Sequence, residues 1–418
     1  MVSGRSLADW LAYIERQHPQ PIALGLERVG EVLGRMKLAL SCPVLTVGGT
    51  NGKGSTCTML ESILRCAGLR TGLYTSPHLQ RYNERVRVAG VEAGNAALAE
   101  SFDAVERARA GVPLTYFEFG TLAALHRFAH EGIEAAILEV GLGGRLDAVN
   151  AIDSDCAVLT SVGIDHVEYL GGSREEIGRE KAGIFRAGKP AIIAEPRPPA
   201  SVLEEIRRIG AAALLIGRDF GYESQGTQWS YWGPGGKRAG LAHPALRGAV
   251  QLRNAAAALA ALDAVRERLP VGMHEIRRGL AEVELPGRFQ VLPGRPQVIL
   301  DVAHNPDAAA VLARNLGESG FARETIAVLG MLRDKDISGV VRAVAPRVTR
   351  WHLTTLPGPR GAQSGELRRI LAEAGIESSV REHASAGEAL AAARGEAGED
   401  DKIVVFGSFL TVAGAYGR

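Results

Sequence analysis

The stretch Val44-Leu-Thr-Val-Gly-Gly-Thr-Asn-Gly-Lys-Gly-Ser-Thr56 decides the fold. Its β-branched beginning is typical of a strand, and the apolar residues that follow Lys53 recur at helical spacing. The glycines allow successive backbone N–H groups to converge on phosphate oxygens, and the helix N-terminus adds positive potential. Lys53 supplies a charge, and Ser55 or Thr56 offers a hydroxyl to Mg²⁺. The stretch therefore predicts a phosphate-binding loop between a strand and a helix.

This loop departs from the common G-x-x-x-x-G-K-[ST] pattern at two positions. Val47 holds the place of the first glycine, and Gly54 follows the lysine. The alternative interpretation is an ordinary strand–helix turn with an exposed lysine. Strand, glycines, lysine and hydroxyls occur together here, and this combination favours the phosphate loop.

Outward from the loop, short apolar runs rich in β-formers alternate with helical patterns, as in parallel βαβ units. The predicted fold class is α/β, with an N-terminal P-loop ATPase-type parallel sheet domain and a smaller Rossmann-like C-terminal α/β domain. The expected strands are Pro43–Val47, Ala135–Val140, Ala157–Ser161, Ala191–Ile193, Val298–Val302, Thr325–Leu329, Trp351–Thr355 and Lys402–Phe406.

The length of 418 residues is too great for one ordinary core and suits two domains. Two Pro-Gly-Arg units between Leu285 and Pro296 are expected to break both helix and strand. We therefore expect a first domain with the phosphate loop over 1–285, a linker or hinge over 286–296 and a Rossmann-like C-terminal domain over 297–418. A small β insert near 222–240 carries aromatic residues, for which packing on the domain is favoured over stacking on a ligand.

Composition excludes several classes of protein. Lys and Arg number 48 against 47 Asp and Glu, so a broad nucleic-acid surface is not expected. The four cysteines form no C-x-x-C pair, which favours reduced thiols. No apolar run approaches the ~20 residues that span a bilayer. The N-terminus reads as a helix with Ser6 and Asp9 in a capping box, not as a signal peptide. We expect a soluble cytoplasmic protein, by default a monomer.

Hard ligands for a metal ion lie in three further segments, each of which ends a predicted strand or enters a loop. Ser76 lies in Thr75-Ser-Pro-His-Leu79, Glu139 ends a buried strand, and Asp165 and His166 follow another. Because the carboxyl ends of parallel strands form the ligand crevice, these groups could converge beside the phosphate loop. A carboxylate in an apolar run such as that around Glu139 is costly unless it is paired or metal-bound. A lone histidine is more often structural, and an imidazole ligand is unusual for Mg²⁺.

Taken together, these residues resemble the Mur ligase superfamily, and specifically its folate branch. Two stretches, Leu24-Gly-Leu-Glu-Arg-Val29 and Leu114-Thr-Tyr-Phe-Glu-Phe119, look like the bifunctional dihydrofolate synthase/folylpolyglutamate synthase form. The segments that match in order and spacing cover essentially the whole chain: Gly49-Thr-Asn-Gly-Lys-Gly-Ser55, Ser76-Pro-His78, Leu138-Glu-Val-Gly-Leu-Gly-Gly-Arg-Leu-Asp147, Arg179-Glu-Lys-Ala-Gly-Ile-Phe185, Pro286-Gly-Arg288, Asp301-Val-Ala-His-Asn-Pro306 and Gly407-Ser408.

The resemblance implies ATP and Mg²⁺ as cofactors, with two metal sites and room for a monovalent cation. The implied metal ligands are Ser76, Glu139 and His166, and the implied catalytic residues are Lys53, Lys181 and His166. The implied ATP contacts are Gly49, Thr50, Asn51, Gly52, Lys53, Gly54, Ser55, Asn254, Arg288, Asp301 and His304. The implied contacts to dihydropteroate are Ile22, Ala23, Leu24, Thr115, Tyr116, Phe117, Glu118, Leu146, Asp147 and Ala148.

The resemblance also implies a carbamate on Lys181, which would turn a cation into an anion able to bind a second Mg²⁺. That chemistry needs a desolvated, neutral amine. From the sequence alone Lys181 looks like part of a solvated charged helix face.

The implied reaction joins L-glutamate to dihydropteroate and to folylpolyglutamates through an acyl phosphate. Its partners are small molecules, without nucleic acid or membrane. The alternatives are a folylpolyglutamate synthase lacking dihydropteroate activity, a cell-wall Mur ligase, and a non-ligase P-loop ATPase. A cell-wall ligase would ordinarily have a further N-terminal domain, for which we expect no room before residue 49.

Overall fold

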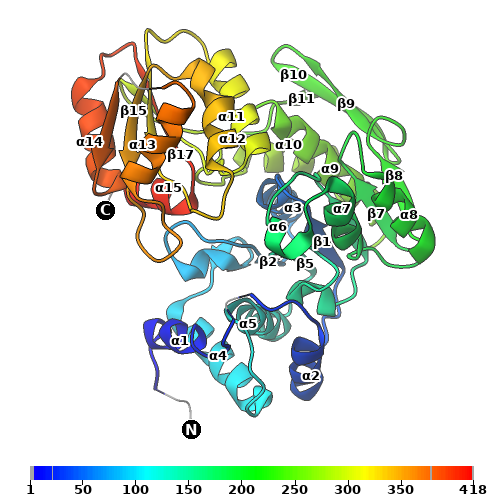
Figure 1. Ribbon diagram of the computed structural model, residues 1–418. Helices are drawn as coiled ribbons and strands as arrows, with labels where there is room; N and C mark the ends of the chain where they lie inside the picture. Colours follow the sequence, from blue (N-terminus) through cyan, green and yellow to red (C-terminus); the bar gives the residue numbers. More distant parts are fainter. Residues whose placement is uncertain (1–3, 21, 377–378, 417–418) are drawn as a thin grey trace. The chain divides into compact units, whose positions relative to one another are not determined.

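The computed structural model describes residues 4–20, 22–376 and 379–416; the outer limits of the expected domains, residues 1 and 418, lie outside these ranges. The chain divides into two compact units, which can be followed by colour in Figure 1. The first unit comprises Met1–Gly163, Leu170–Ala245 and Gln251–Val283. The second comprises Ile164–Tyr169, Leu246–Val250 and Glu284–Arg418.

The first unit is built on an eight-stranded sheet with the order β4-β3-β2-β5-β1-β6-β7-β8. The six strands from β2 to β8 in this order are parallel, whereas β3 and β4 extend one edge in antiparallel pairing. The strands are β1 (Val44–Gly48), β2 (Thr71–Tyr74), β3 (Val86–Val88), β4 (Val91–Glu92), β5 (Ala135–Glu139), β6 (Cys156–Leu159), β7 (Pro190–Ile193) and β8 (Ala212–Leu215).

Strand β1 lies between β5 and β6, and its register with these two strands positions the candidate site. Val47 is paired with Glu139 on one side, and Gly48 is paired with Leu159 on the other. All five residues of β1 are buried, as expected for a parallel strand covered on both faces. The carboxyl ends of β1, β5 and β6 therefore lie next to one another at one edge of the sheet.

Helix α3 (Lys53–Cys66) begins directly after the phosphate loop and is buried from Gly54 to Leu64. It packs on β1, β2 and β5, and also on α10 (Met273–Glu282). The contact with α10 is close: a Cβ on Gly279 would lie 2.5 Å from the Cα of Ile63. The buried residues of α3 include polar ones, and Ser62 Oγ donates to Gly279 O at 2.7 Å across the contact with α10. The close packing fixes the helix that carries the loop.

The other helical elements of the first unit surround this sheet. They are α1 (Leu7–Ile14), α2 (Glu27–Met36), η1 (Tyr82–Arg85), α4 (Asn95–Arg109), α5 (Tyr116–Glu131), η2 (Ala148–Ala151), α7 (Arg174–Ala182), α8 (Ala200–Ile209) and α9 (Val250–Ala264), the last beginning at the unit boundary. The expected capping box of α1 is present: the Ser6 side chain accepts from Asp9 N, and Asp9 accepts from Ser6 N.

A small antiparallel sheet, with the order β11-β10-β9, follows the large one in the chain. Its strands are β9 (Gly221–Gln225), β10 (Gln228–Gly233) and β11 (Gly236–Ala242). Trp229 and Tyr231 are fully buried, and β11 packs on α10. These aromatic residues therefore pack against the first unit. This agrees with the interpretation that the sequence favours.

The second unit contains a six-stranded sheet with the order β12-β13-β17-β14-β15-β16. All neighbours are parallel except β12 and β13. The strands are β12 (Gln290–Leu292), β13 (Gln297–Leu300), β14 (Thr325–Leu329), β15 (Arg350–Thr354), β16 (Val380–His383) and β17 (Lys402–Phe406). The helices are α6 (Val167–Leu170), which begins in this unit, α11 (Pro306–Glu318), α12 (Ile337–Val344), η3 (Ala345–Arg347), α13 (Ser364–Glu373), α14 (Ala386–Glu396) and α15 (Phe409–Ala415).

These sheets confirm the predicted α/β class with a smaller C-terminal α/β domain. One local expectation is wrong. The segment between Leu285 and Pro296 was expected to break strand as well as helix, yet it contains β12, which pairs with β13. Four residues lie between the two Pro-Gly-Arg units, and three of them suffice for a short edge strand, since an edge strand needs only one paired side.

Among the described residues, no helix combines the length and apolarity that crossing a membrane requires. The four cysteines, all within the described ranges, have free thiols.

Candidate active site

The phosphate loop is held by the residues that follow β6. The backbone N–H groups of Thr50 and Asn51 donate to Ser161 O and Ser161 Oγ, each at 2.9 Å. Thr160 Oγ1 donates to Asn51 O at 2.8 Å. Gly49 has φ +146°, and a Cβ there would lie 1.9 Å from Thr160 Oγ1, so only glycine fits. Bonds within the protein therefore fix the shape of the loop.

Two candidate ATP contacts lie within this loop region. Lys53 Nζ folds back onto the loop and donates to Gly49 O at 3.0 Å and to Thr50 O at 3.2 Å. Asn254, at the start of α9, is buried, and a Cβ on Gly52 would lie 2.7 Å from its Oδ1. The fold thus brings Asn254 beside the loop from a position some 200 residues away in sequence.

The candidate metal ligands of the first unit are also neighbours. Glu139 is the last residue of β5 and is 5% exposed, and its Oε2 accepts a hydrogen bond from Ser76 N at 3.1 Å. A buried carboxylate and a hydroxyl at the end of an apolar strand are the hard oxygen donors that Mg²⁺ takes. The described residues contain no group of three His, Cys, Asp or Glu side chains placed to hold a metal ion, so phosphate and water oxygens would have to complete the coordination.

The third candidate ligand, His166, belongs to the second unit. It has φ +52°, an uncommon backbone conformation for a residue with a side chain. Its Nε2 lies 3.2 Å from Lys335 Nζ, and Lys335 also donates to Asp165 Oδ1 at 2.6 Å. Burial alone would raise the pKa of Asp165, but hydrogen bonding from His304 and the charge of Lys335 outweigh it and hold this pKa far below its usual value. Asp165 is therefore ionised.

Candidate ATP contacts of the second unit form a further group. The carboxylate of Asp301, a partly buried residue, accepts hydrogen bonds from Phe289 N at 2.9 Å and Ala303 N at 2.8 Å. Burial raises the pKa of Asp301. The guanidinium of Arg288 lies over the ring of Phe409, 5.1 Å from its centroid. The third candidate, His304, lies 3.6 Å from the Asp165 carboxylate.

The three segments expected to enclose dihydropteroate converge in the first unit. Gly25 N, next to Ile22, Ala23 and Leu24, donates to Leu146 O at 3.3 Å. Helices α2 and α5 both contact η2, which begins at Ala148. The ring of Phe117 lies so close to Gly141 that a Cβ there would be 2.6 Å from its Cζ. Thr115 caps α5, and Tyr116 and Glu118 lie in its first turn.

Asp147 is the buried acid of this region. It accepts hydrogen bonds from Leu142 N at 2.8 Å and Val149 N at 3.0 Å. Burial nevertheless raises its pKa to about 6. A carboxyl poised near neutrality in a candidate substrate site can donate or accept a hydrogen bond according to pH.

Lys181 differs from the interpretation of the sequence alone. It is only 4% exposed, so it is not part of a solvated face. The sequence gives the wrong expectation because the neighbours of Lys181 on α7 are charged. In the structure, α7 turns Lys181 and Ile177 inward. Burial supplies the desolvation that a carbamate needs, but the carbamate itself stays a prediction.

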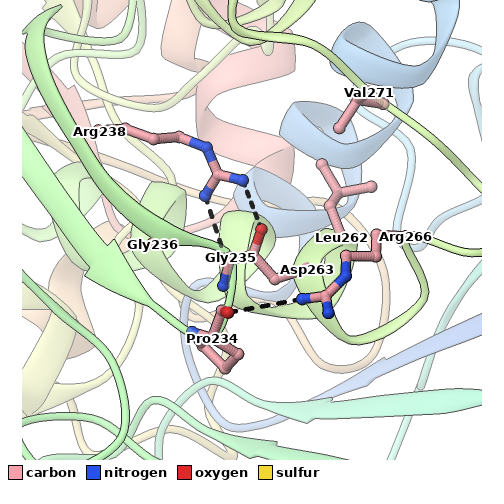
Figure 2. A pocket seen from close by; sticks show the side chains of 8 residues that line it. All are labelled: Pro234, Gly235, Gly236, Arg238, Leu262, Asp263, Arg266 and Val271. Atoms are coloured by element: carbon pink, nitrogen blue, oxygen red, sulfur yellow. Dashed lines mark hydrogen bonds and ion pairs between the residues drawn. The ribbon is translucent and has the colours of Figure 1, made fainter.

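A surface hollow of about 480 Å³ lies elsewhere, at the turn between β10 and β11 (Figure 2). Buried Asp263 accepts hydrogen bonds there from Tyr231, Gly235 and Arg238, which ties the small sheet to α9. Asp263 lies nine residues after Asn254, roughly 13 Å along the helix. The hollow is therefore separate from the phosphate loop. Its lining residues are Pro234, Gly235, Gly236, Arg238, Leu262, Asp263, Arg266 and Val271.

Two charged residues of these sites, Lys335 and Arg28, are not among the site residues predicted from the sequence. Lys335 is 6% exposed, and its partner Asp165 lies 170 positions away in the chain. The buried lysine in Arg333-Asp-Lys-Asp336 is flanked by acids and looks like a solvated run, so no local signal marks it.

The fold and the phosphate loop define an ATP-binding ligase of the Mur type. The model of the Mur ligase middle domain matches residues 47–262, and that of the Mur ligase glutamate ligase domain matches residues 287–409. The chain is 45% identical over 408 residues to the dihydrofolate synthase/folylpolyglutamate synthase of Escherichia coli K12, covering 97% of this chain and 94% of that protein. The corresponding protein of Haemophilus influenzae is 40% identical, covering 97% and 96%.

Solved structures give the same result. Escherichia coli FolC in complex with DHPP and ADP superimposes with a TM-score of 0.94 at 44% identity, covering 98% of this chain and 96% of that one. The bifunctional enzyme from Yersinia pestis complexed with AMPPNP and Mn ion gives 0.90 at 46% identity, covering 98% and 97%. The chain belongs to the dihydrofolate synthase/folylpolyglutamate synthase family. It is accordingly an ATP-dependent glutamate ligase that acts on small molecules and uses a divalent metal.

Proposed function

We propose that this chain joins L-glutamate both to dihydropteroate and to reduced folylpolyglutamates, through an acyl phosphate. The observation that carries the proposal is the convergence of the segments around Ile22–Leu24, Thr115–Glu118 and Leu146–Ala148 in the unit that also contains the phosphate loop. The proposal agrees with the similarity of the chain to the dihydrofolate synthase/folylpolyglutamate synthases of Escherichia coli and Haemophilus influenzae.

In this mechanism the N–H groups of the phosphate loop and Lys53 hold the ATP phosphates. The substrate carboxylate attacks the γ-phosphorus in line, the bond to the β,γ-bridging oxygen breaks, and ADP leaves as the acyl phosphate forms. Positioning and charge neutralisation supply most of the rate, because the protein has little covalent chemistry to perform. The amine of glutamate, as the free base, then attacks the acyl phosphate and phosphate leaves. Water must be excluded, because it would hydrolyse the acyl phosphate.

Glu139 and Ser76 fit a Mg²⁺ ion by their chemistry, and we propose His166 as the further ligand. When bound, the metal neutralises charge on the transferred phosphoryl group. We assign ATP contacts to Asn254, Arg288, Asp301 and His304. A carbamate on Lys181 would add a second anionic group, for which its burial gives support.

The assay that tests this function measures ADP release with dihydropteroate and L-glutamate omitted in turn. A ligase should be nearly silent unless both are present, whereas a P-loop switch hydrolyses ATP regardless. Replacing dihydropteroate by tetrahydrofolate or by a cell-wall precursor separates the remaining alternatives. We expect turnover with the first two and none with the precursor. Turnover with tetrahydrofolate alone would leave a folylpolyglutamate synthase.

We further propose that the chain acts in the cytoplasm as a monomer. Free thiols at all four cysteines agree with a reducing compartment. Light scattering at micromolar concentration should give a mass near that of one chain, 44.3 kDa. Twice that mass would overturn the monomer.

A further inference from the structure

Arg28 of α2 and Glu118 of α5 form an ion pair that is largely shielded from solvent. Arg28 Nη2 donates to Glu118 Oε1 at 2.8 Å, and Arg28 Nε donates to Oε2 at 3.4 Å. The side chains are 25% and 5% exposed, so solvent screens the pair less than it screens a surface pair. The helices that carry the two residues contact each other and can be found in Figure 1.

Both carboxylate oxygens of Glu118 accept hydrogen bonds from groups of the protein. Besides Arg28, its Oε2 accepts a hydrogen bond from Thr115 N at 2.7 Å, and Glu118 N donates to Thr115 Oγ1 at 3.2 Å. This reciprocal capping box fixes the first turn of α5. Glu118 is therefore placed to bind groups of the protein itself. The family resemblance implies a direct contact of Glu118 with dihydropteroate, and such a contact does not account for these bonds.

Arg28 also reaches the irregular segment that precedes α2. Its Nη2 donates to Ala23 O at 2.8 Å. On the other side of this segment, Gly25 N bonds to Leu146 O. Gly25 has φ +149°, and a Cβ there would lie 2.9 Å from Glu27 Oε2, so glycine lets the chain make this turn. The segment 22–25 has no helix or strand of its own and depends on these bonds for its shape.

We propose that Arg28 and Glu118 are positioning residues that hold Ile22–Leu24 against the start of α5 and thereby shape the dihydropteroate site. The inference rests on the proposed function, because it needs dihydropteroate to bind there. If the segment has its binding-competent shape only part of the time, the apparent affinity for the ligand falls in proportion to the fraction of molecules that have this shape. Losing the pair should therefore weaken binding of this substrate while leaving the phosphate-transfer groups in place.

The test uses steady-state kinetics of the full chain with Arg28→Met and Glu118→Gln. Glutamine at this position can still form a capping box, so Glu118→Gln removes mainly the charge. We expect KM for dihydropteroate to rise about tenfold, with kcat and KM for ATP within about twofold of wild type, which is the signature of lost uniform binding. Arg28→Lys keeps the charge and should restore part of the affinity.

Arg35→Met is the matched control, because Arg35 also lies on α2 and donates to Arg109 O at 2.8 Å, outside the candidate dihydropteroate segments. Its kinetics should match wild type. A melting temperature that falls while KM for dihydropteroate stays unchanged would show a purely structural pair and overturn the proposal. Equal increases in KM for ATP and dihydropteroate would overturn it as well. If Arg28→Met is insoluble, the same criteria apply to Arg28→Lys and Glu118→Gln.

The two proposals fail in different ways. Wild-type enzyme that cannot use dihydropteroate rejects both the proposed function and the positioning role. Wild-type enzyme that uses dihydropteroate, together with unchanged KM in all three variants, rejects the positioning role alone.

Discussion

Ser76 and Glu139 are joined by a hydrogen bond from the Ser76 backbone N–H to Glu139 Oε2, 3.1 Å long. This bond links the residue that ends β5 to the turn that follows the neighbouring strand β2. It leaves the Ser76 hydroxyl and the Glu139 carboxylate in one small region beside the end of β1. The relationship explains how two residues 63 positions apart could serve one cation.

Glu139→Gln should raise the Mg²⁺ concentration needed for half-maximal rate by on the order of 100-fold, since even indirect partners of a metal cost 10–100-fold. The amide oxygen can still accept from Ser76 N, so the local fold should persist. A magnesium titration of ADP release measures the effect. Glu61→Gln, at a buried acid paired with Arg87, is the control and should leave the metal dependence unchanged. An unaltered titration for Glu139→Gln would remove Glu139 from the metal site.

Lys53→Ala should reduce glutamate-dependent ADP release by about 10²–10³-fold, because a preorganised charge at the transferred phosphate is lost. Circular dichroism should show an intact fold, since the Lys53 Nζ bonds within the described part of the chain go to two loop carbonyls. Turnover like that of wild type would exclude Lys53 from the mechanism.

Gly49→Ala should abolish nucleotide binding and destabilise the protein by about 1–3 kcal/mol. The added Cβ would lie 1.9 Å from Thr160 Oγ1, at a φ that favours glycine. Gly188→Ala is the matched control: its φ is +67°, but nothing lies within 4 Å of the added Cβ. It should cost about 1 kcal/mol and leave binding intact. Fluorescence titration with a nucleotide analogue, together with chemical denaturation, would measure both. Equal nucleotide affinity in the two variants would contradict the role of the loop.

Phe117→Ala should lower kcat/KM for dihydropteroate more than for tetrahydrofolate. The ring lies against Gly141 and 5.8 Å from the ring of Tyr74, and its loss opens the wall of the proposed dihydropteroate site. Parallel assays with the two substrates give the ratio. Equal losses would argue against a separate dihydropteroate site.

Asp147 predicts a pH dependence of stability. Its folded pKa, about 6, is above the ordinary 3.8 because it is buried, so the folded state favours the protonated form. The contribution of Asp147 to the free energy of unfolding is fully present below about pH 4 and is lost as pH rises through about 6. The loss is about 3 kcal/mol at most. Compared with Asp147→Asn, wild type should lose stability over this window in denaturant titrations of the ligand-free protein. A constant difference between the two from pH 4 to 7 would contradict the raised pKa.

The sequence was most informative where one local pattern carries the structure. Thr325–Leu329 and Lys402–Phe406 were predicted with their observed bounds, because each is a buried apolar run between turn residues. The phosphate loop was predicted for the same reason, since its glycines, lysine and helix are contiguous.

The sequence was uninformative where long-range contacts decide. The Arg28–Glu118 pair spans 90 positions, and each residue alone looks like an ordinary charge on a helix. Burial of Lys181 depends on the packing of α7 on α8, which no local pattern reveals. The short strands β2 and β12 have too few residues for a periodic signal and form because a neighbouring strand offers unpaired backbone groups.

The most direct test of the central claim is a crystal structure of this protein with a non-hydrolysable ATP analogue and Mn²⁺, with the cation located by its anomalous scattering. We expect the terminal phosphate to lie against the N–H groups of Gly49–Ser55. We expect the cation to lie about 2.2 Å from a Glu139 oxygen and within ligand distance of His166. A cation bound away from both side chains, or a triphosphate bound outside this loop, would contradict it.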